Sequence, residues 1–571
     1  MLRFLIPLAL AVAVVIGAAA VTLRTGGPPA DLVWTAGPEV KTLDPAQITL
    51  LTDARVAEAL FEGLVVQDPR DLRVRPGVAE RWEVSPDGLT YTFHLREDAR
   101  WSDGRPVTAD DFAWAWRRVL DPKTAAEYVY MLYPIRGAKA YFEAAADLSA
   151  VACRAKAEAA AHNLTPQRQT GAVQADWSQV GVRVEGPRRL VVELERPTAY
   201  FLDLVAFSTY LPVRRDNVES SGDRWTMPPN LISNGAYRLA EWRFRSRMIW
   251  EKNPFYWNAG SVALGRIEVR VFADDKTPLL AYETGAVDLT TVVPPLAIQP
   301  LLEARDAGRR TDVVDATNFG TYFYRFNCAD PVLSDVRVRR ALALAMDRRA
   351  IVERAARGGQ VPATTFVPPG LPGYASPPGL EENVAEARRL LAEAGHPGGA
   401  GLEDLSILVN SGFVHKPIAE LVQQEWSEAL GVTVRIEEVE TTSFFDKVRK
   451  GEYRIARGGW YGDYLDPNTF LDCFVTGGGN NQTGWASAEY DALIERAAGL
   501  ADPAERMRVL ARAEAILLRE VPVVPMYVYT NLTLVRPGLE GVYPNLMNRI
   551  DFALLRWAGR GSEAGAAPGP R

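Results

Sequence analysis

Cysteine and histidine are scarce in this chain: three cysteines and four histidines occur among 571 residues. Three cysteines allow at most one bond within the chain, which excludes a scaffold built on disulfides. Four histidines argue against a histidine-rich metal site, because such a site uses several of them at once. We therefore expect no metal and no other cofactor.

An excess of basic charge is also lacking. The chain has 64 Lys and Arg against 71 Asp and Glu, which gives a net charge of −7. Binding to phosphates needs a basic face, so nucleic acid is not expected as the main partner. Apolar residues make up 47% of the chain and charged residues 24%. These values are ordinary for a globular protein and exclude a disordered, collagen-like or multi-span membrane chain.

Long apolar runs are absent beyond the N-terminus. Residues 4–23 are almost unbroken apolar sequence, with Arg3 before them, Arg24 after them and alanines at 18–20. This pattern is typical of an export signal, and about 20 apolar residues also suffice to span a bilayer core. We expect residues 1–30 to form a signal peptide or an N-terminal membrane anchor plus linker. The protein would then be periplasmic or lie on the outer face of the cytoplasmic membrane.

The rest of the chain predicts a mixed α/β architecture. Residues 82–84 and 89–95 read as two strands joined by the turn sequence Ser-Pro-Asp-Gly, and 182–194 as a further strand. Thr108 is a plausible N-cap for a helix over 112–120. Helices are predicted at 337–354, 383–394, 417–430 and 503–519, and strands at 405–409 and 432–436. The Ala-rich stretch 144–176, which contains Cys153, reads as a surface insertion with a free thiol.

Several motifs occur together in a fixed order along the chain. They include Thr-Leu-Asp-Pro at 42–45, Leu-Phe-Glu-Gly-Leu at 60–64, Asn-Gly-Ala-Tyr at 234–237 and Gly-Trp-Tyr-Gly-Asp-Tyr at 459–464. Others lie at 76–80, 91–96, 101–112, 253–257 and 336–342. With these motifs the chain resembles the oligopeptide-binding type of ABC-transporter solute-binding proteins (extracellular solute-binding protein family 5). The resemblance runs from about residue 31 to residue 558.

The resemblance implies an α/β, bilobal periplasmic-binding-protein-like fold, with mixed sheets, a hinge between the lobes and an extra α+β domain inserted in the first lobe. Lobe I is expected over 31–61, 189–319 and 531–558, and the extra domain over 62–188. Lobe II is expected over 320–530, followed by a disordered tail at 559–571. The implied function is to capture oligopeptides in the cleft between the lobes and to deliver them, as a monomer, to an ABC permease.

A peptide of any sequence offers a backbone, an α-ammonium and a carboxylate. A buried carboxylate of the protein can read the ammonium, and the resemblance gives this role to Asp463. A turn residue is the alternative, since Gly462 precedes it. Arg457 matches a family arginine near the ligand's C-terminal end, although it could be a solvated charge. A family lysine falls on Ala356, with Arg357 beside it, so recognition of the carboxylate is expected to be rearranged.

The remaining ligand-binding residues implied by the resemblance line the same cleft. Gly459 and Tyr461 would offer main-chain groups to the peptide, and Leu50 and Leu51 would offer them from the other lobe. Trp460 would line a side-chain pocket, with core packing as the alternative. His415 can meet the peptide carboxylate or serve as a surface cap. Further family cleft positions are held by Asn410, Tyr128 and Tyr529.

The chain departs from the family pattern at a cysteine pair. The best-known oligopeptide binders carry this pair at the positions of Gly320 and Tyr461, so that bridge is absent here. Cys328 and Cys473 are the candidate disulfide that could replace it, since an exported protein permits oxidation. The distance that such a bond requires cannot be tested from sequence.

Other functions remain open at this stage. Relatives carry dipeptides, nickel, haem or sugars, so another small solute is one alternative. An exported hydrolase is a second, with Asp463 and Asp466 as paired carboxylates. However, no His-Glu-x-x-His helix, Gly-x-Ser-x-Gly elbow or His-paired Cys occurs, and we assign no catalytic residue. A chaperone or receptor using the same cleft is a third, because fold does not fix function.

Overall fold

The computed structural model describes residues 28–147, 175–412, 414–500 and 502–559. The predicted signal or anchor segment up to residue 27 lies outside the described residues. So do Cys153 with most of the insertion at 144–176, and the tail from residue 560. Within the described ranges no helix combines the length and the apolar character that a membrane span requires.

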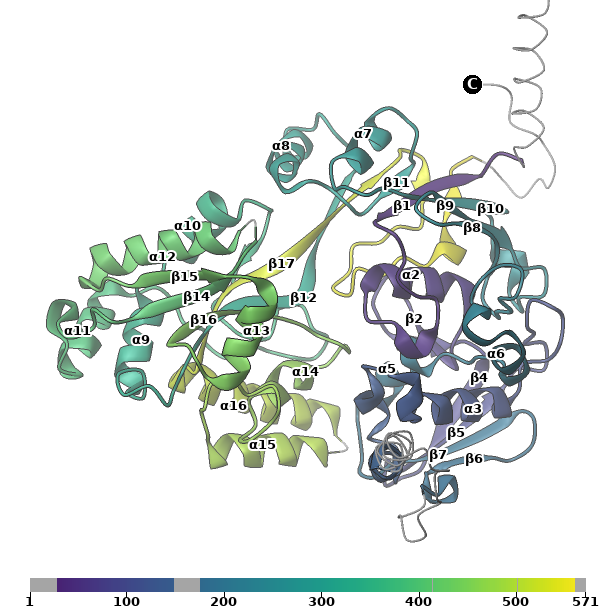
Figure 1. Ribbon diagram of the computed structural model, residues 1–571, viewed down its shortest axis with the longest axis horizontal. Coiled ribbons are helices and arrows are strands. Elements are labelled where there is room, and N and C mark those ends of the chain that lie inside the picture. The colour runs from purple at the N-terminus through teal and green to yellow at the C-terminus, as the bar shows by residue number, and fades with distance from the viewer. Residues whose placement is uncertain (1–27, 148–174, 413, 501, 560–571) are drawn as a thin grey trace, which may run out of the picture.

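Two lobes are joined by a pair of long antiparallel strands, β12 (Val313–Phe326) and β17 (Val523–Val535) (Figure 1). We call lobe I the residues before β12 together with the segment after β17, and lobe II the residues between the two strands. The predicted bilobal α/β fold is confirmed. The predicted lobe boundaries at 319/320 and 530/531 fall inside β12 and β17, so each strand contributes to both lobes.

One mixed sheet runs through both lobes. Its strand order is β15-β14-β16-β12-β17-β11-β1-β10-β9-β8, with β13 also paired to β17. The pairing register of β12 with β17 shifts between Thr317 and Thr321, where the chain crosses from one lobe to the other. A bulge of this kind bends a strand and marks the hinge position. Besides β12 and β17, this sheet contains β15 (Arg435–Val439), β14 (Ser406–Asn410), β16 (Ile455–Tyr461), β11 (Leu289–Thr290), β1 (Leu32–Gly37), β10 (Arg266–Val271), β9 (Arg247–Lys252), β8 (Tyr237–Arg243) and β13 (Val361–Pro362).

Lobe I also holds an antiparallel sheet with the order β4-β5-β7-β6. The predicted strand at 182–194 is two strands, because the chain turns at Gly186 with a φ of +87°. Thr108 caps the helix that follows β5 as predicted, and Asp111 closes the capping box. The strands are β4 (Ala79–Val84), β5 (Thr90–Leu95), β6 (Val182–Val184) and β7 (Arg189–Glu193), with the pairs β2 (Val65–Gln67) with β3 (Val74–Pro76) and β18 (Leu539–Glu540) with β19 (Arg556–Trp557) elsewhere in the lobe.

The helices of lobe I surround these sheets and a large core rich in aromatic side chains. Trp34 of β1 and Trp250 of β9 pack on Phe552, with ring centroids 4.7 and 5.1 Å from it. The C-terminal segment is therefore part of the core of lobe I. The helices are α2 (Leu51–Leu60), α3 (Ala109–Val119), α5 (Phe201–Val205), α6 (Arg215–Ser221), α7 (Thr277–Glu283) and α8 (Pro295–Asp306), with a 3-10 turn η3 (Val129–Leu132) that faces the cleft side.

Lobe II packs its helices on both faces of β14, β15 and β16 (Figure 1). The helix predicted at 337–354 is wrong as one element: α9 (Val336–Leu344) ends, and a new turn begins at Asp347. The Asp347 carboxylate accepts from the backbone N–H of Ala350 at 2.9 Å and so caps the second piece. The other helices are α10 (Arg348–Ala350), α11 (Val384–Glu393), α12 (His415–Leu430), α13 (Thr441–Lys450), α14 (Asn468–Leu471), α15 (Ala488–Ala498) and α16 (Pro503–Glu520).

Candidate ligand-binding site

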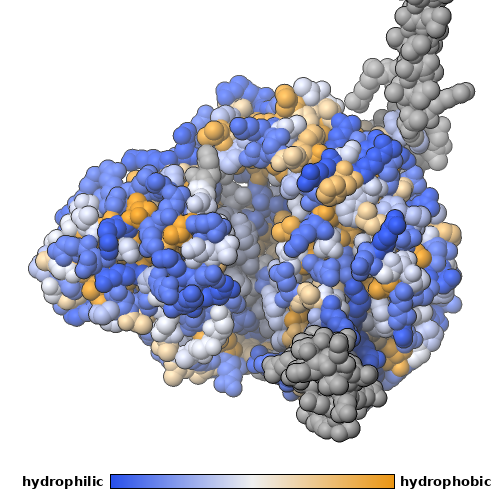
Figure 2. All heavy atoms as spheres, in the orientation of Figure 1, coloured by the Kyte–Doolittle hydropathy of each residue, from blue (hydrophilic) through white to orange (hydrophobic). Residues whose placement is uncertain are grey.

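The surface is hollowed between the two lobes, and β16 of lobe II borders this cleft (Figures 1 and 2). β14 pairs with β16 only at Ile455 and Ala456, whereas β12 pairs with β16 through Tyr461. Residues 457–461 of β16 therefore have one edge with no strand beside it among the described residues. An extended peptide can add to such an edge through main-chain hydrogen bonds.

The direction of the backbone groups along this edge follows from one hydrogen bond. Gly462 donates its N–H to the carbonyl of Phe319 in β12 at 2.7 Å. Because backbone groups alternate in direction along an antiparallel strand, Tyr461 and Gly459 point theirs away from β12. The main-chain groups of these two residues, singled out from the sequence, thus face the unpaired edge.

Arg457 lies at one end of this edge and is held on two sides. Its Nε donates to Asn410 Oδ1 at 2.5 Å, and its guanidinium lies 4.7 Å from the ring centroid of Phe444. Phe445 lies 5.7 Å away and is about half exposed. Within the described residues the Nη groups of Arg457 make no hydrogen bond or ion pair, so they are available for a carboxylate. The structure thus brings Arg457 and Asn410 together.

His415 begins α12 beside this arginine. Its Nδ1 lies 3.2 Å from the Tyr322 hydroxyl, and the two rings stack with centroids 5.7 Å apart. Burial, followed by the charge of Arg457, lowers the pKa of His415 to about 4. His415 is therefore neutral at physiological pH and contributes a hydrogen bond, whereas Arg457 supplies the positive charge.

Asp463 lies beyond the other end of β16. Its Oδ2 accepts a hydrogen bond from the hydroxyl of Tyr130, which belongs to η3 of lobe I, at 3.1 Å. Its backbone N–H donates to Thr469 Oγ1 at 3.2 Å, which fixes the loop. Burial raises the pKa of Asp463 to about 6, and the hydrogen bond from Tyr130 opposes this rise. A half-buried carboxylate with no cation beside it is suited to pairing with an ammonium.

Aromatic side chains connect the two ends. Tyr461 stacks on Tyr529 with centroids 4.5 Å apart, and a Cβ at Gly459 would come within 2.5 Å of the Tyr529 hydroxyl. Trp460 projects to the opposite face of β16, where it packs against the core of lobe II. Trp460 is thus only partly buried, and its position is compatible with both the pocket and the core alternatives.

The remaining candidates, Tyr128, Leu50 and Leu51, belong to lobe I. Tyr128 packs against Tyr130 and Phe207, with centroids 5.8 and 5.2 Å apart, which places it at the Asp463 end. Leu50 and Leu51 lie where the chain enters α2, and their side chains are 48% and 45% exposed. Exposed leucines of this size are suited to contact with a ligand.

The disulfide candidate is wrong: Cys328 and Cys473 are both free thiols. Each sulfur faces its own segment, since Cys473 Sγ donates to the Thr469 carbonyl at 3.4 Å and Cys328 Sγ lies 3.8 Å from the Phe326 carbonyl. Arg357, beside the buried Ala356, is exposed at a positive φ of 53° and approaches none of the candidate residues through a hydrogen bond or ion pair among the described residues.

Three contributors were missed from the sequence. Tyr130 bonds Asp463 from a position 333 residues away, and Phe444 packs on Arg457 from α13. Tyr322 bonds His415 from β12. None of them belongs to the motifs that carry the resemblance. For Tyr130 the sequence offered one signal, a second tyrosine two residues after Tyr128.

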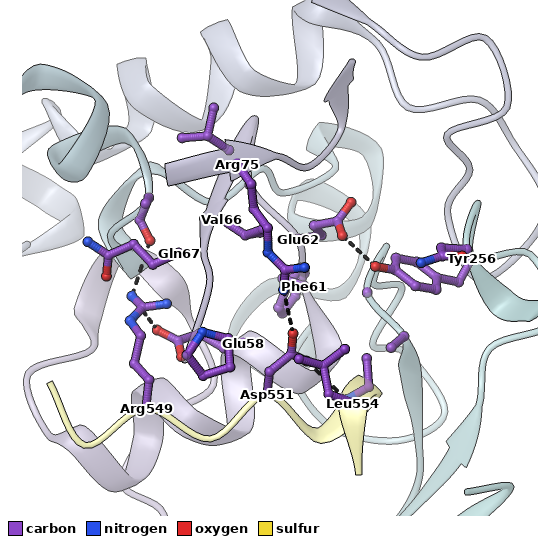
Figure 3. A pocket seen from close by; sticks show the side chains of 18 of the residues that line it. Glu58, Phe61, Glu62, Val66, Gln67, Arg75, Tyr256, Arg549, Asp551 and Leu554 are labelled. Carbon is purple, nitrogen blue, oxygen red and sulfur yellow. Dashed lines mark hydrogen bonds and ion pairs between the residues drawn. The ribbon is translucent and has the colours of Figure 1, made fainter. Parts of the chain in front are cut away.

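A cavity of about 130 Å³ is lined by residues of lobe I, including Glu58, Glu62, Arg75, Tyr256 and Asp551 (Figure 3). Several of its polar groups bond one another: Glu62 accepts from the Tyr256 hydroxyl at 2.5 Å and from Trp257 Nε1 at 2.7 Å. Arg75 pairs with Asp551 at 3.1 Å, which ties the C-terminal segment to β3. A polar cavity of this size holds a few water molecules, so we assign it a structural role.

Two lobes on a hinge, with an unpaired strand edge and opposite charges at the two ends of the cleft, define a binding protein for an extended solute. The chain belongs to the bacterial extracellular solute-binding proteins, family 5, whose model (described as the family's middle region) matches residues 73–482. The predicted family is confirmed.

Individual relatives cover nearly the whole chain. The periplasmic oligopeptide-binding protein OppA of Salmonella typhimurium is 33% identical over 517 residues, 89% of each chain. The probable deoxycholate-binding periplasmic protein YgiS of Escherichia coli is 32% identical over 506 residues, 88% of each chain. The unliganded open form of the MppA periplasmic murein tripeptide binding protein matches with a TM-score of 0.78 and 31% identity, over 92% of this chain and 97% of that one.

Proposed function

We propose that this protein captures oligopeptides in its interlobe cleft and delivers them to an ABC permease. The observation that carries the proposal is the unpaired edge of β16, which has Asp463 at one end and Arg457 at the other. The edge reads a peptide backbone, Asp463 reads the ammonium and Arg457 reads the carboxylate. These are the three features that peptides of any sequence share.

The spacing of the two charged residues bounds the length of the ligand. Asp463 follows Arg457 by six positions, and six steps of extended chain span roughly 20 Å. The charge-assisted hydrogen bonds at the two ends of the ligand occupy part of this span, which shortens the gap that the peptide itself must fill. A ligand of about three to five residues fits this spacing.

The relatives leave a choice between solutes, and the site supports peptides. OppA is named for oligopeptides, YgiS for deoxycholate and MppA for a murein tripeptide. Deoxycholate carries a carboxylate and no ammonium. A half-buried Asp463 without a cation would repel such a ligand and attract a peptide N-terminus.

We further propose that the protein acts as a monomer outside the cytoplasm, like the periplasmic relatives. The apolar segment at 4–23 would direct its export, and a retained segment would hold the protein near its permease. Edman sequencing or intact mass of the protein from membrane and soluble fractions distinguishes cleavage from retention.

Calorimetric titration with unmodified tri-, tetra- and pentapeptides tests the binding function. We expect saturable binding by the wild type and a loss of about 100-fold or more in Asp463→Asn, because one partner of a desolvated ion pair is removed. Asp404→Asn, an exposed carboxylate of lobe II, is the matched control and should bind like the wild type.

Two results would count against this function. One is a folded wild type that binds none of the peptides, and the other is an Asp463→Asn variant that binds as tightly as the control. Mass spectrometry of the released peptide adds a further check. A cleaved peptide would favour the hydrolase alternative, whereas recovery of the intact peptide favours transport.

A further inference from the structure

Tyr130 reaches across the cleft to the residue proposed to hold the ligand ammonium. It lies in η3 of lobe I, its side chain is 45% exposed, and its hydroxyl donates to Asp463 Oδ2 at 3.1 Å. A tyrosine this exposed is not held by core packing. The hydrogen bond between Tyr130 and Asp463 is therefore not a by-product of core packing, and we look for its role in the cleft.

The surroundings of Asp463 provide no other donor to its carboxylate among the described residues. Arg506 is engaged by Asp466, three residues after Asp463, through two bonds of 2.5 and 3.0 Å. Asp472 faces Asp463 from the segment after β16 and adds negative charge, with its own pKa raised to about 7 by burial and then by the charges of Asp463 and Asp466. The other titratable groups nearby are Cys473 and Tyr128, both neutral.

We propose that Tyr130 is a positioning residue of the ammonium site: its hydroxyl, donated from the opposite lobe, fixes the Asp463 carboxylate and keeps it ready to pair with a protonated amine. This inference rests on the proposed function and names a residue that the family motifs do not include. It also restricts one end of the cleft to ligands that bring an ammonium.

The geometry lets Tyr130 and a ligand share the carboxylate. Tyr130 occupies Oδ2 and leaves Oδ1 open, and a carboxylate accepts several hydrogen bonds at once. An ammonium has three donors, so it can bond Oδ1 and also the lone pairs of the Tyr130 oxygen. Burial followed by the charge of Asp463 raises the pKa of Tyr130 above its usual range, so the hydroxyl keeps its proton and remains a donor.

The same contact acts on the charge of Asp463. Burial favours the protonated carboxyl, whereas a hydrogen bond to the carboxylate favours the ionised form that an ammonium needs. Removing the hydroxyl should thus raise the pKa of Asp463 and move the loss of binding to higher pH. A residue that only tied the lobes together would not move this pH dependence.

A second contact between the lobes provides a control for a residue that only holds the two lobes together. Tyr200 of lobe I stacks on Tyr464 of lobe II with centroids 4.4 Å apart and an interplanar angle of 11°. α5, which follows Tyr200, faces α14 on the side of the cleft away from β12 and β17 (Figure 1). Tyr200→Ala weakens this contact without removing a donor to Asp463.

The test is titration of the full protein with trialanine and tetraalanine from pH 5 to pH 9. The variants are Tyr130→Phe, Tyr200→Ala and Tyr133→Phe, the last being a matched loss of a hydroxyl near the same turn. We expect wild-type affinity to fall as the pH drops through about 6. In Tyr130→Phe the fall should begin about 0.5–1 pH unit higher. In the other two variants the affinity should fall at the same pH as in the wild type.

If Tyr130→Phe loses affinity at the same acidic pH as the wild type, this inference is overturned while the proposed function stands. A shift that Tyr200→Ala or Tyr133→Phe reproduces also overturns it, because the role of Tyr130 would then be structural. A wild type that binds neither peptide at any pH overturns both. The melting temperature of each variant shows whether it is folded. Because the Tyr130 side chain is exposed, we expect Tyr130→Phe to melt close to the wild type.

Discussion

Gly320 of β12 lies directly opposite Tyr461 of β16, and the tyrosine ring fills the space that a side chain at Gly320 would occupy. A Cβ at Gly320 would come within 2.6 Å of Tyr461 Cδ1. The positions at which the best-known oligopeptide binders carry a cysteine pair are thus cross-strand neighbours here. In this chain the Tyr461 ring, stacked on Tyr529, takes the place of that bond.

This pairing predicts that Gly320→Cys combined with Tyr461→Cys forms a disulfide. Because Gly462 bonds β12, the pair at 461 and 320 is of the non-hydrogen-bonded kind, in which Cα atoms lie about 4.5 Å apart. The bond would close a long loop and stabilise the oxidised protein by about 2–4 kcal/mol. Melting temperatures with and without dithiothreitol measure it, and equal values with no mass change on reduction would contradict the assigned register.

A second prediction concerns the absence of a side chain at Gly459. Gly459→Ala places a methyl group within 2.5 Å of the Tyr529 hydroxyl, so the ring must move away from Tyr461. We expect peptide affinity to fall about tenfold, since the stacked rings of Tyr461 and Tyr529 shift beside the strand edge that binds the peptide backbone. Adding Tyr529→Phe removes the clashing oxygen and should restore part of the loss. If Gly459→Ala binds peptides with wild-type affinity, the rings of Tyr461 and Tyr529 do not contact the ligand.

A third prediction separates the carboxylate end of the cleft from the ammonium end. Arg457→Met keeps an unbranched aliphatic side chain and removes the charged guanidinium, which lies over Phe444. Affinity for tetraalanine should fall about 10- to 100-fold, whereas its C-terminal amide should bind both proteins alike. Arg435→Met on β15, an exposed arginine, serves as the control. An equal loss for acid and amide would mean that Arg457 supports the fold and does not read the carboxylate.

The local parts of the site could be predicted from the sequence, because they lie on one strand and its continuation. The motif at 459–464 contains Gly459, Tyr461 and Asp463 in this order, and strand alternation orients Gly459 and Tyr461 within β16. Thr108 was likewise predictable, since a capping box uses residues three apart. Such signals depend on neighbours in the chain and survive without tertiary information.

Contacts between distant segments could not be predicted. Tyr130 and Asp463 are far apart in sequence and meet because η3 and the end of β16 face each other across the cleft. The helix predicted at 337–354 failed for a related reason: Asp347 fits the periodic pattern but caps a new turn. Cys328 and Cys473 pack in one region of lobe II, yet the sequence could not show that their sulfurs point elsewhere.

A fourth prediction follows from these thiols. Since Cys328 and Cys473 are free, a reducing agent should leave the melting temperature of the protein unchanged. Native disulfides contribute about 2–5 kcal/mol, so a bond would lower the melting temperature by several degrees when reduced. Thiol titration in denaturant without reductant should detect both residues. A drop in melting temperature with dithiothreitol would show a bond that the structure lacks.

The last prediction concerns Glu62, at the cavity inside lobe I. Burial raises its pKa from the ordinary 4.5 to about 7, while the hydrogen bonds from Tyr256 and Trp257 oppose the rise. Between these two values the folded protein holds a proton that the unfolded chain releases, so stability falls as pH rises from about 4.5 to 7. The contribution is about 3 kcal/mol over the window, at about 1.4 kcal/mol per pH unit. Glu62→Gln cannot titrate, so its stability relative to the wild type should increase across the window by about this amount. Urea unfolding at several pH values measures the difference, and Glu97→Gln, at an exposed surface glutamate, should run parallel to the wild type. Parallel curves for Glu62→Gln would show that Glu62 ionises in the fold as it does in water.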